Sequence, residues 1–229
     1  MNPTAATAEQ VVRVDVGPVS LEGNLGIPPR ARGVVLFAHG SGSSRHSPRN
    51  RYVAGQLRQA GLATLLVDLL TPAEEAEDLV TGHLRFDIGL LAGRLVGATR
   101  WLSQEPRTHD LPIGHFGAST GAAAALVAAA QLPGEVAAVV SRGGRPDLAG
   151  DSLPRVRAPT LLIVGGDDVP VIGLNRQALA RLGSARKEIV IVPGASHLFE
   201  EPGALEEVAR LASEWFARHL GRPAGHEVG

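Results

Sequence analysis

The sequence predicts an α/β fold: a three-layer α/β/α sandwich built on a mostly parallel sheet of about eight strands. Two observations lead to this prediction. Short apolar runs without alternation recur along the chain, and such runs are typical of strands buried on both faces. Segments with the periodicity of amphipathic helices separate these runs, as in parallel sheets that are covered by helices on both faces.

The composition is that of a globular domain. The 229 residues contain 44% hydrophobic and 20% charged side chains, without an internal repeat or a block of like charges. A chain of this length can bury a continuous core. We therefore expect residues 1–229 to form a single domain, in which about residues 222–229 are a flexible tail.

The expected elements follow in chain order. Residues 11–16 and 19–27 alternate weakly on either side of Gly17-Pro18 and predict an antiparallel pair at the sheet edge. Buried strands are expected at 34–38, 63–69, 113–116, 136–140, 160–164 and 188–192. Helices are expected at 48–60 (capped by Ser47), at 86–102, at 122–130, around 175–182 and at about 202–220. In such sheets the functional residues follow the C-terminal ends of the strands.

The segment Gly117-Ala118-Ser119-Thr120-Gly121 lies between an apolar run and an alanine-rich run. This order predicts a strand, a sharp turn and a helix. A serine at the apex of such a turn projects its hydroxyl from the sheet, and the glycines let strand and helix approach. The spacing alone is weak evidence because the chain has 28 glycines, and the alternative is an ordinary glycine-rich connection. The flanking elements favour a nucleophile elbow with Ser119 at its apex.

A serine nucleophile needs an imidazole to take its proton and a carboxylate behind that imidazole. His197 directly follows the expected strand at 188–192, whereas His219 ends a helix and His226 lies in the C-terminal tail. His197 is therefore the predicted base.

Two carboxylates follow the expected strand at 160–164, Asp167 and Asp168, in a glycine turn. We favour Asp168, because an acid one residue further past the turn can reach back toward the loop of His197. The chain order Ser119, Asp168, His197 is that of hydrolases with a nucleophile elbow.

Two backbone N–H groups are predicted to form an oxyanion hole. One belongs to Thr120, at the start of the alanine-rich helix, and the other to Ser41, in the small-residue turn after the strand at 34–38. His39, in the same turn, is expected to hydrogen-bond neighbouring loops rather than to act in catalysis.

Three further side chains are candidates for substrate binding. Arg45 and Arg142 follow strand ends and are suited to an anionic group, although such arginines also pair with loop carboxylates. Phe199 either walls the acyl pocket or packs beneath the histidine loop. Residues 141–158 are too few for a helical cap domain, so the site is expected to be open.

The composition also limits the partners. A net charge of −1 without a basic stripe argues against nucleic acid, and the absence of cysteine excludes disulfides and a cysteine nucleophile. Residues 1–10 do not have the pattern of a signal peptide, and the longest apolar run is too short to cross a bilayer. We therefore expect a cytoplasmic protein with a small-molecule substrate, no membrane contact, no metal and no cofactor. Homodimer formation stays open.

The chain resembles the α/β-hydrolase superfamily, and most closely its dienelactone hydrolase-like branch. The matching residues are His39-Gly40, the Gly117–Gly121 elbow, the Gly165-Gly166-Asp167-Asp168 turn and His197. The resemblance implies a fold without a cap domain, a Ser119–His197–Asp168 triad and hydrolysis of esters without a cofactor. The sequence departs from true dienelactone hydrolases, which use a cysteine nucleophile and carry a glutamate where this chain has His39-Gly40.

The predicted function is therefore hydrolysis of small carboxylic esters through an acyl-enzyme, as in a serine carboxylesterase. Acyltransferases, thioesterases, lactonases and peptidases use the same triad, and these alternatives stay open. An alternative of another class is a catalytically silent interaction module, against which the intact triad residues argue.

Overall fold

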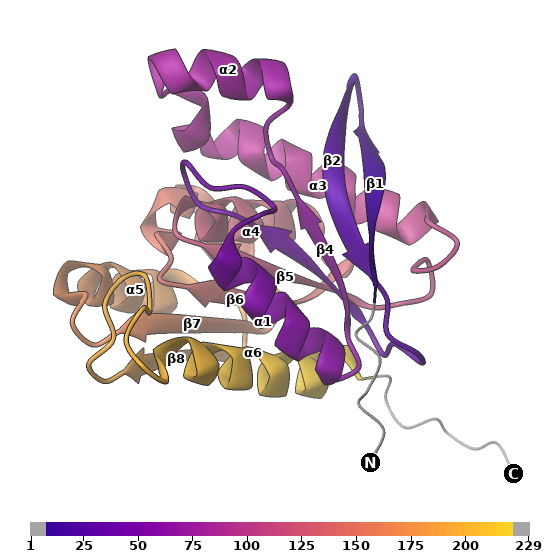
Figure 1. The fold of residues 1–229 in the computed structure, drawn as a ribbon. Coiled ribbons are helices and arrows are strands. Elements are labelled where there is room, and N and C mark those ends of the chain that lie inside the picture. Colours follow the sequence, from indigo (N-terminus) through magenta and orange to yellow (C-terminus); the bar gives the residue numbers. More distant parts are fainter. Residues whose placement is uncertain (1–7, 222–229) are drawn as a thin grey trace, which may run out of the picture.

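The computed structural model describes residues 8–221 and contains one eight-stranded sheet, in the order β1-β2-β4-β3-β5-β6-β7-β8 (Figure 1). β1 and β2 pair antiparallel at one edge, β2 pairs antiparallel with β4, and the remaining strands are parallel. The predicted sheet and its antiparallel edge are thus confirmed. The predicted tail at 222–229 lies outside the described residues.

The strands are β1 (Glu9–Val16), β2 (Val19–Gly26), β3 (Val34–Ala38), β4 (Ala63–Val67), β5 (Ile113–Ala118), β6 (Val136–Arg142), β7 (Thr160–Gly165) and β8 (Lys187–Val192). The α-helices are α1 (Pro48–Gln59), α2 (Pro72–Thr81), α3 (Ile88–Gln104), α4 (Thr120–Gln131), α5 (Val169–Arg181) and α6 (Ala204–Leu220). Two 3₁₀ segments, η1 (Leu84–Phe86) and η2 (Pro146–Arg155), complete the list.

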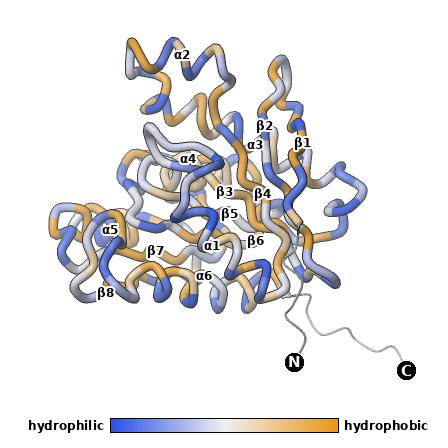
Figure 2. The backbone as a smooth tube through the Cα atoms, in the orientation of Figure 1, coloured by the Kyte–Doolittle hydropathy of each residue, from blue (hydrophilic) through white to orange (hydrophobic). Residues whose placement is uncertain are grey.

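The sheet separates two apolar cores. In β3, Val34 and Leu36 face the core beneath α3 and α4, while Val35 and Phe37 face the core beneath α1 and α6. Both faces of the inner strands are therefore buried, which explains why their sequences do not alternate. Figure 2 shows hydrophobic segments gathered in these strands.

Local signals account for where the helices begin. The hydroxyl of Ser47 accepts a hydrogen bond from the Asn50 N–H, so the predicted cap of α1 is confirmed. Helix α3 begins at Ile88, two residues later than expected, because Asp87 caps it and η1 precedes it. Helix α5 begins at Val169, earlier than expected, directly after the turn that follows β7.

Helix α2 was not expected from the sequence. Its only buried residue is Asp78, and Leu79 and Val80 are exposed, so it lacks the apolar stripe that reveals most helices. A capping box of Thr71 and Glu74 starts the helix. It stands at the top of the molecule in Figure 1, beside the turn that follows β3.

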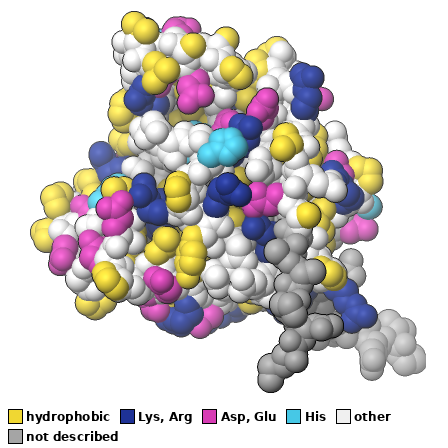
Figure 3. All heavy atoms as spheres, viewed as in Figure 1, with side chains coloured by type: hydrophobic (Ala, Val, Ile, Leu, Met, Phe, Trp, Pro, Cys, Tyr) yellow, Lys and Arg dark blue, Asp and Glu magenta, His cyan; other side chains and the backbone are white. Residues whose placement is uncertain are grey.

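The molecular surface carries both signs of charge. On the face drawn in Figure 3, basic and acidic side chains are interspersed, in keeping with the net charge of −1. In the part of the chain that the structure describes, no helix combines the length and the hydrophobicity needed to cross a membrane.

Candidate active site

Ser119 lies at the sharp turn between β5 and α4, partly exposed at the C-terminal end of the sheet. Its backbone has φ 51° and ψ −122°, a conformation that is strained for a residue with a Cβ atom. This is the geometry that a nucleophile elbow requires.

The glycines of this turn are required by close backbone contacts. A Cβ atom at Gly117 would lie 2.4 Å from the Ala122 Cα, and one at Gly121 would lie 2.3 Å from the carbonyl oxygen of Ala38. Strand β5, helix α4 and the end of β3 can therefore meet only if both positions lack a side chain.

His197 and Asp168 are in direct contact. The Nδ1 atom of His197 lies 2.7 Å from Oδ2 of Asp168, and the two side chains are 39% and 13% exposed. The neighbouring Asp167 instead uses its backbone N–H to bind the Ala195 carbonyl, which ties the two loops together. With Nδ1 donating to the carboxylate, Nε2 of His197 is the nitrogen that can accept a proton.

Ser119 and His197 both lie close to the C-terminal end of β6. The Ser119 N–H donates to the carbonyl of Arg142 at 3.3 Å. The next residue, Gly143, has φ 50°, and a Cβ atom there would lie 3.6 Å from Nδ1 of His197. The two side chains thus lie at one end of β6, although no hydrogen bond joins Ser119 Oγ to His197 within residues 8–221. In unliganded enzymes such bonds are often long or poorly aligned.

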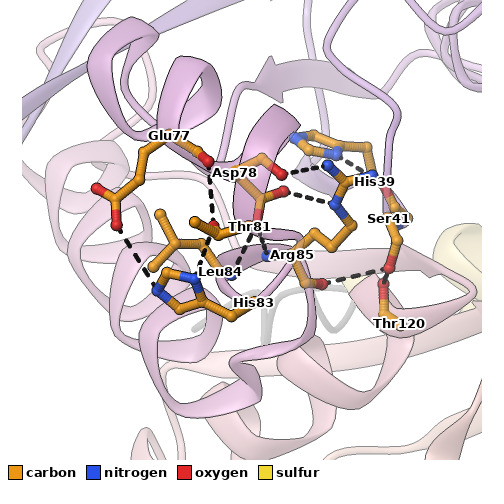
Figure 4. Close-up of polar contacts among 10 residues, drawn as sticks. His39, Ser41, Glu77, Asp78, Thr81, His83, Leu84, Arg85 and Thr120 are labelled. Carbon is orange, nitrogen blue, oxygen red and sulfur yellow. Dashed lines mark hydrogen bonds and ion pairs between the residues drawn. The ribbon is translucent and has the colours of Figure 1, made fainter.

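The two predicted oxyanion donors are brought together by a short chain of hydrogen bonds. The Ser41 N–H donates to Thr120 Oγ1 at 3.0 Å, Ser41 Oγ lies 2.9 Å from Thr120 Oγ1, and Ser41 Oγ donates to the carbonyl of Arg85 at 3.2 Å (Figure 4). The Ser41 N–H is therefore occupied here, and it must exchange the Thr120 hydroxyl for a substrate oxygen before it can stabilise an oxyanion. The Thr120 N–H begins α4 and has no acceptor within the helix.

His39 braces the same turn. Its Nε2 accepts a hydrogen bond from the Leu69 N–H at 3.1 Å, and its Nδ1 lies 3.0 Å from the Gly40 carbonyl. Burial lowers the pKa of His39 below its usual value, which favours the neutral ring that these two contacts need.

A pocket of about 90 Å³ opens beside the turn formed by residues 39–44. Its other wall is formed by Leu70, Leu79, Arg85 and Leu91. Helix α2 and η1 thus cover the pocket beside the turn that carries Ser41, while Ser119 and His197 are both partly exposed.

The segment that covers the pocket, α2 and η1, is held in place by the carboxylate of Asp78. The sequence analysis did not identify this residue. Asp78 accepts hydrogen bonds from the N–H groups of Leu84 and Arg85, at 2.7 and 3.1 Å, and from the guanidinium of Arg85, at 2.5 Å (Figure 4). Burial alone would raise the pKa of Asp78, but these hydrogen bonds lower it below its ordinary value. The sequence gives no signal for this contact beyond the acidic composition of the segment.

The three candidate substrate-binding residues have different surroundings in the structure. The guanidinium of Arg45 contacts the carboxylates of Asp68 and Glu22, so Arg45 is held by the protein and does not face a substrate. Phe199 is 1% exposed and packs in the core beneath α6, so it supports the histidine loop rather than walling a pocket. Arg142 lies against Phe199, with Cζ 6.0 Å from the centre of the ring.

The chain is similar in sequence and in fold to several known proteins. Residues 21–220 match the profile of the Dienelactone hydrolase family. A crystal structure of a dienelactone hydrolase from Anabaena variabilis is 67% identical, with a TM-score of 0.92 over 94% of this chain and 99% of that one. Est1E from Butyrivibrio proteoclasticus, at 15% identity and a TM-score of 0.75 over 91% of this chain and 98% of that one, shares the fold.

Two relatives from Mycobacterium tuberculosis strains CDC 1551 and H37Rv carry the name "Putative phosphoribosyl transferase". Each is 59% identical over 215 residues, which are 94% of this chain but 47% of the relative. This chain thus spans about half the length of these relatives. The matched profile and the Anabaena structure together show that the chain belongs to the dienelactone hydrolase family, a family of hydrolases with the α/β-hydrolase fold.

Proposed function

We propose that this protein is a serine hydrolase that cleaves small carboxylic esters through an acyl-enzyme intermediate. One observation carries the proposal: the 2.7 Å contact between His197 and Asp168, on loops beside the strained turn of Ser119. A carboxylate holds the imidazole in the tautomer that accepts a proton from serine.

The proposed reaction has two stages. Oγ of Ser119 attacks the ester carbonyl carbon while its proton passes to Nε2 of His197. The tetrahedral oxyanion then collapses, and the alcohol leaves with that proton. A water molecule attacks the acyl-enzyme, again giving a proton to His197, and the carboxylic acid is released as Oγ of Ser119 is reprotonated.

The N–H groups of Thr120 and Ser41 are the proposed oxyanion donors. Thr120 supplies the positive end of α4, and Ser41 supplies an N–H that first releases Thr120 Oγ1. The pocket of about 90 Å³ beside the 39–44 turn suits a small acyl or alcohol group rather than a long chain.

Acyl transfer and the cleavage of thioesters, lactones or peptides stay alternatives that use the same residues. An assay of the products separates them, because the acceptor and the bond cleaved differ. The transferase name of the mycobacterial relatives belongs to proteins about twice as long as the part matched here, so we assign hydrolysis to this chain instead.

A fluorophosphonate probe tests the proposal. The probe is expected to label the protein once, with the adduct on Ser119, and Ser119→Ala is expected to lose both labelling and hydrolysis of p-nitrophenyl esters. Ser103→Ala is the matched control, because Ser103 lies in α3 and donates to the Thr99 carbonyl away from the site. Undiminished hydrolysis by Ser119→Ala, or an adduct on another residue, would refute the proposal.

A further inference from the structure

Helix α5 begins at one member of the predicted triad. Asp168 is the N-cap residue of α5, and its carbonyl accepts the N–H groups of Val171 and Ile172, at 3.0 and 3.1 Å. From this position its carboxylate contacts His197. A residue that fixes α5 against the neighbouring loops therefore also fixes the carboxylate that orients the predicted base.

Asn175 lies in α5, seven residues or about two helical turns after Asp168, and its side chain is fully buried. Its Nδ2 group donates two hydrogen bonds. One goes to the Val171 carbonyl within the helix, at 2.8 Å, and the other goes to the Gly144 carbonyl, at 3.0 Å. Gly144 belongs to the loop of residues 142–145 that follows β6, here called the β6 loop. Asn175 thus ties α5 to the β6 loop.

The β6 loop holds the backbone of Ser119 on both sides. The Arg142 carbonyl accepts the Ser119 N–H at 3.3 Å, and the Arg145 N–H donates to the Ser119 carbonyl at 3.1 Å. Between these two residues, a Cβ atom at Gly143 would lie 2.9 Å from the His197 carbonyl oxygen. The loop is therefore in contact with both the predicted nucleophile and the predicted base.

The two central residues of the β6 loop are glycines, which have no side chains to pack. Gly143 has φ 50°, a conformation that favours glycine, and a Cβ atom at Gly144 would lie 2.0 Å from Oγ of Ser141. The loop therefore depends on hydrogen bonds to neighbouring elements. These run from the Gly143 N–H to the Ile163 carbonyl in β7, at 2.8 Å, and from Asn175 to the Gly144 carbonyl.

Stability alone does not account for an asparagine at this position. The Oδ1 atom of Asn175 is buried without a hydrogen-bond donor among the described residues, and an unpaired buried carbonyl costs folding free energy. We propose that Asn175 is a positioning residue for the predicted triad. Its bond to Gly144 fixes the β6 loop, and this loop holds the nucleophile and the base in place relative to the carboxylate of Asp168. This inference rests on the proposed function and adds to it a residue that does not touch the reacting atoms.

Asn175→Thr tests the proposal. The threonine hydroxyl can still donate to the Val171 carbonyl, as it does in other helices, but it is too short to reach Gly144. A small displacement of the reacting groups lowers the rate far more than substrate binding. We therefore expect kcat for p-nitrophenyl acetate to fall about tenfold or more, with KM changed less than about twofold. Asn175→Leu, which also removes the unpaired oxygen, serves the same comparison if threonine prevents folding.

Thr108→Val is the matched control. Thr108 is also buried, and its hydroxyl donates to the Leu102 carbonyl at 2.8 Å, a bond of the same kind that precedes β5 rather than following it. Both variants are expected to lower the melting temperature by a few degrees, and only Asn175→Thr is expected to lower kcat. A lower melting temperature in both variants with kcat unchanged in both would overturn the inference, because Asn175 would then have a structural role alone.

Hydrogen exchange separates this inference from the proposed function, because it needs no substrate. The amides of Ser119, Gly143 and Arg145 donate the bonds that join the β6 loop to its neighbours. Their exchange is expected to accelerate about tenfold or more in Asn175→Thr but not in Thr108→Val. If the unmodified protein hydrolyses esters while these amides exchange equally in both variants, the inference is overturned and the proposed function stands. If the unmodified protein hydrolyses no ester, the proposed function fails, and the exchange rates alone decide whether Asn175 positions the Ser119 backbone.

Discussion

At the scale of single residues, the backbone of Ser119 is held in its strained conformation by its neighbours. The Ser119 N–H binds the Arg142 carbonyl, and the Ser119 carbonyl accepts the N–H of Arg145. A Cβ atom at Gly40 would lie 3.0 Å from the Cβ of Ser119, so the turn after β3 also approaches closely. Such strain persists only where the surrounding structure over-determines it. These close contacts explain why glycines are spaced as they are around Ser119 in the sequence.

Gly121→Ala is expected to damage both stability and activity. The added Cβ would lie 2.3 Å from the Ala38 oxygen and 2.5 Å from the His39 oxygen, both backbone atoms. We expect a loss of roughly 1–3 kcal/mol in the free energy of unfolding, as for other overpacked sites, and a large fall in kcat/KM. Urea unfolding and ester hydrolysis measure the two effects.

Gly93→Ala is the control for this substitution. Gly93 lies in α3, where an added Cβ meets nothing within 4 Å, so the change is expected to leave activity intact and to stabilise the helix slightly. If Gly121→Ala behaved like Gly93→Ala, the close approach of β3 to α4 would not constrain the site.

The residues of the site were predictable to different degrees. Ser119, Asp168 and His197 each follow a strand, and strand ends can be placed from sequence because parallel strands share one C-terminal edge. The pairing of Arg45 with Asp68 and the bond from Ser41 to Thr120 join segments that are distant in the chain. Nothing in the local pattern specifies such pairs, so the choice between a substrate-binding and a structural arginine had to come from the structure.

At the scale of elements, the strands were predictable and α2 was not. A strand buried on both faces is a continuous apolar run, and each of the six runs from which a buried strand was expected forms one. Helix α2 buries Asp78 instead of an apolar face and is attached through polar contacts to Arg85 and Leu84. Periodicity methods detect apolar faces, so a helix held by a buried carboxylate escapes them.

Asp78→Asn is expected to loosen the segment that covers the pocket. The substitution removes the charge that binds the Arg85 guanidinium and weakens the bonds from the Leu84 and Arg85 amides. We expect hydrogen exchange of these two amides to accelerate about tenfold or more, in line with the strength of a charge-assisted bond. We also expect kcat/KM to fall, because the Arg85 carbonyl holds the Ser41 hydroxyl.

Glu77→Gln is the matched control on the same helix. Glu77 is exposed, and the ion pair of its carboxylate within residues 8–221 is with the exposed His83, at 3.8 Å (Figure 4). The substitution is therefore expected to change neither the exchange of the Leu84 amide nor the ester hydrolysis. Unchanged exchange in Asp78→Asn would mean that other contacts hold the cover in place.

At the scale of the whole molecule, one buried titratable group couples stability to pH. His115 lies in β5, fully buried, with Nε2 2.9 Å from the hydroxyl of Thr99 in α3. Burial lowers the pKa of His115 to about 4, with a smaller opposing contribution from the Ala125 carbonyl. In the unfolded chain the pKa of this histidine returns to its ordinary value of 6.5.

Between pH 6.5 and about 4 the unfolded chain therefore carries a proton on His115 that the folded protein lacks. The stability that is present at pH 7 is lost as the pH falls through this window. The loss attributable to His115 approaches roughly 3 kcal/mol at pH 4. His39, whose pKa burial also lowers, acts in the same direction.

Replacing His115 by leucine isolates this contribution. In His115→Leu the Thr99 hydroxyl keeps its acceptor, the Leu95 carbonyl at 2.7 Å, so no buried donor is stranded. The free energy of unfolding is measured in urea at pH 7 and at pH 4. Its decrease between these two pH values is expected to be roughly 3 kcal/mol smaller in this variant than in the unmodified protein. His46→Gln, at an exposed histidine, is expected to retain the full difference. An equal pH dependence in all three proteins would show that His115 is protonated inside the fold, and that the core accommodates its charge.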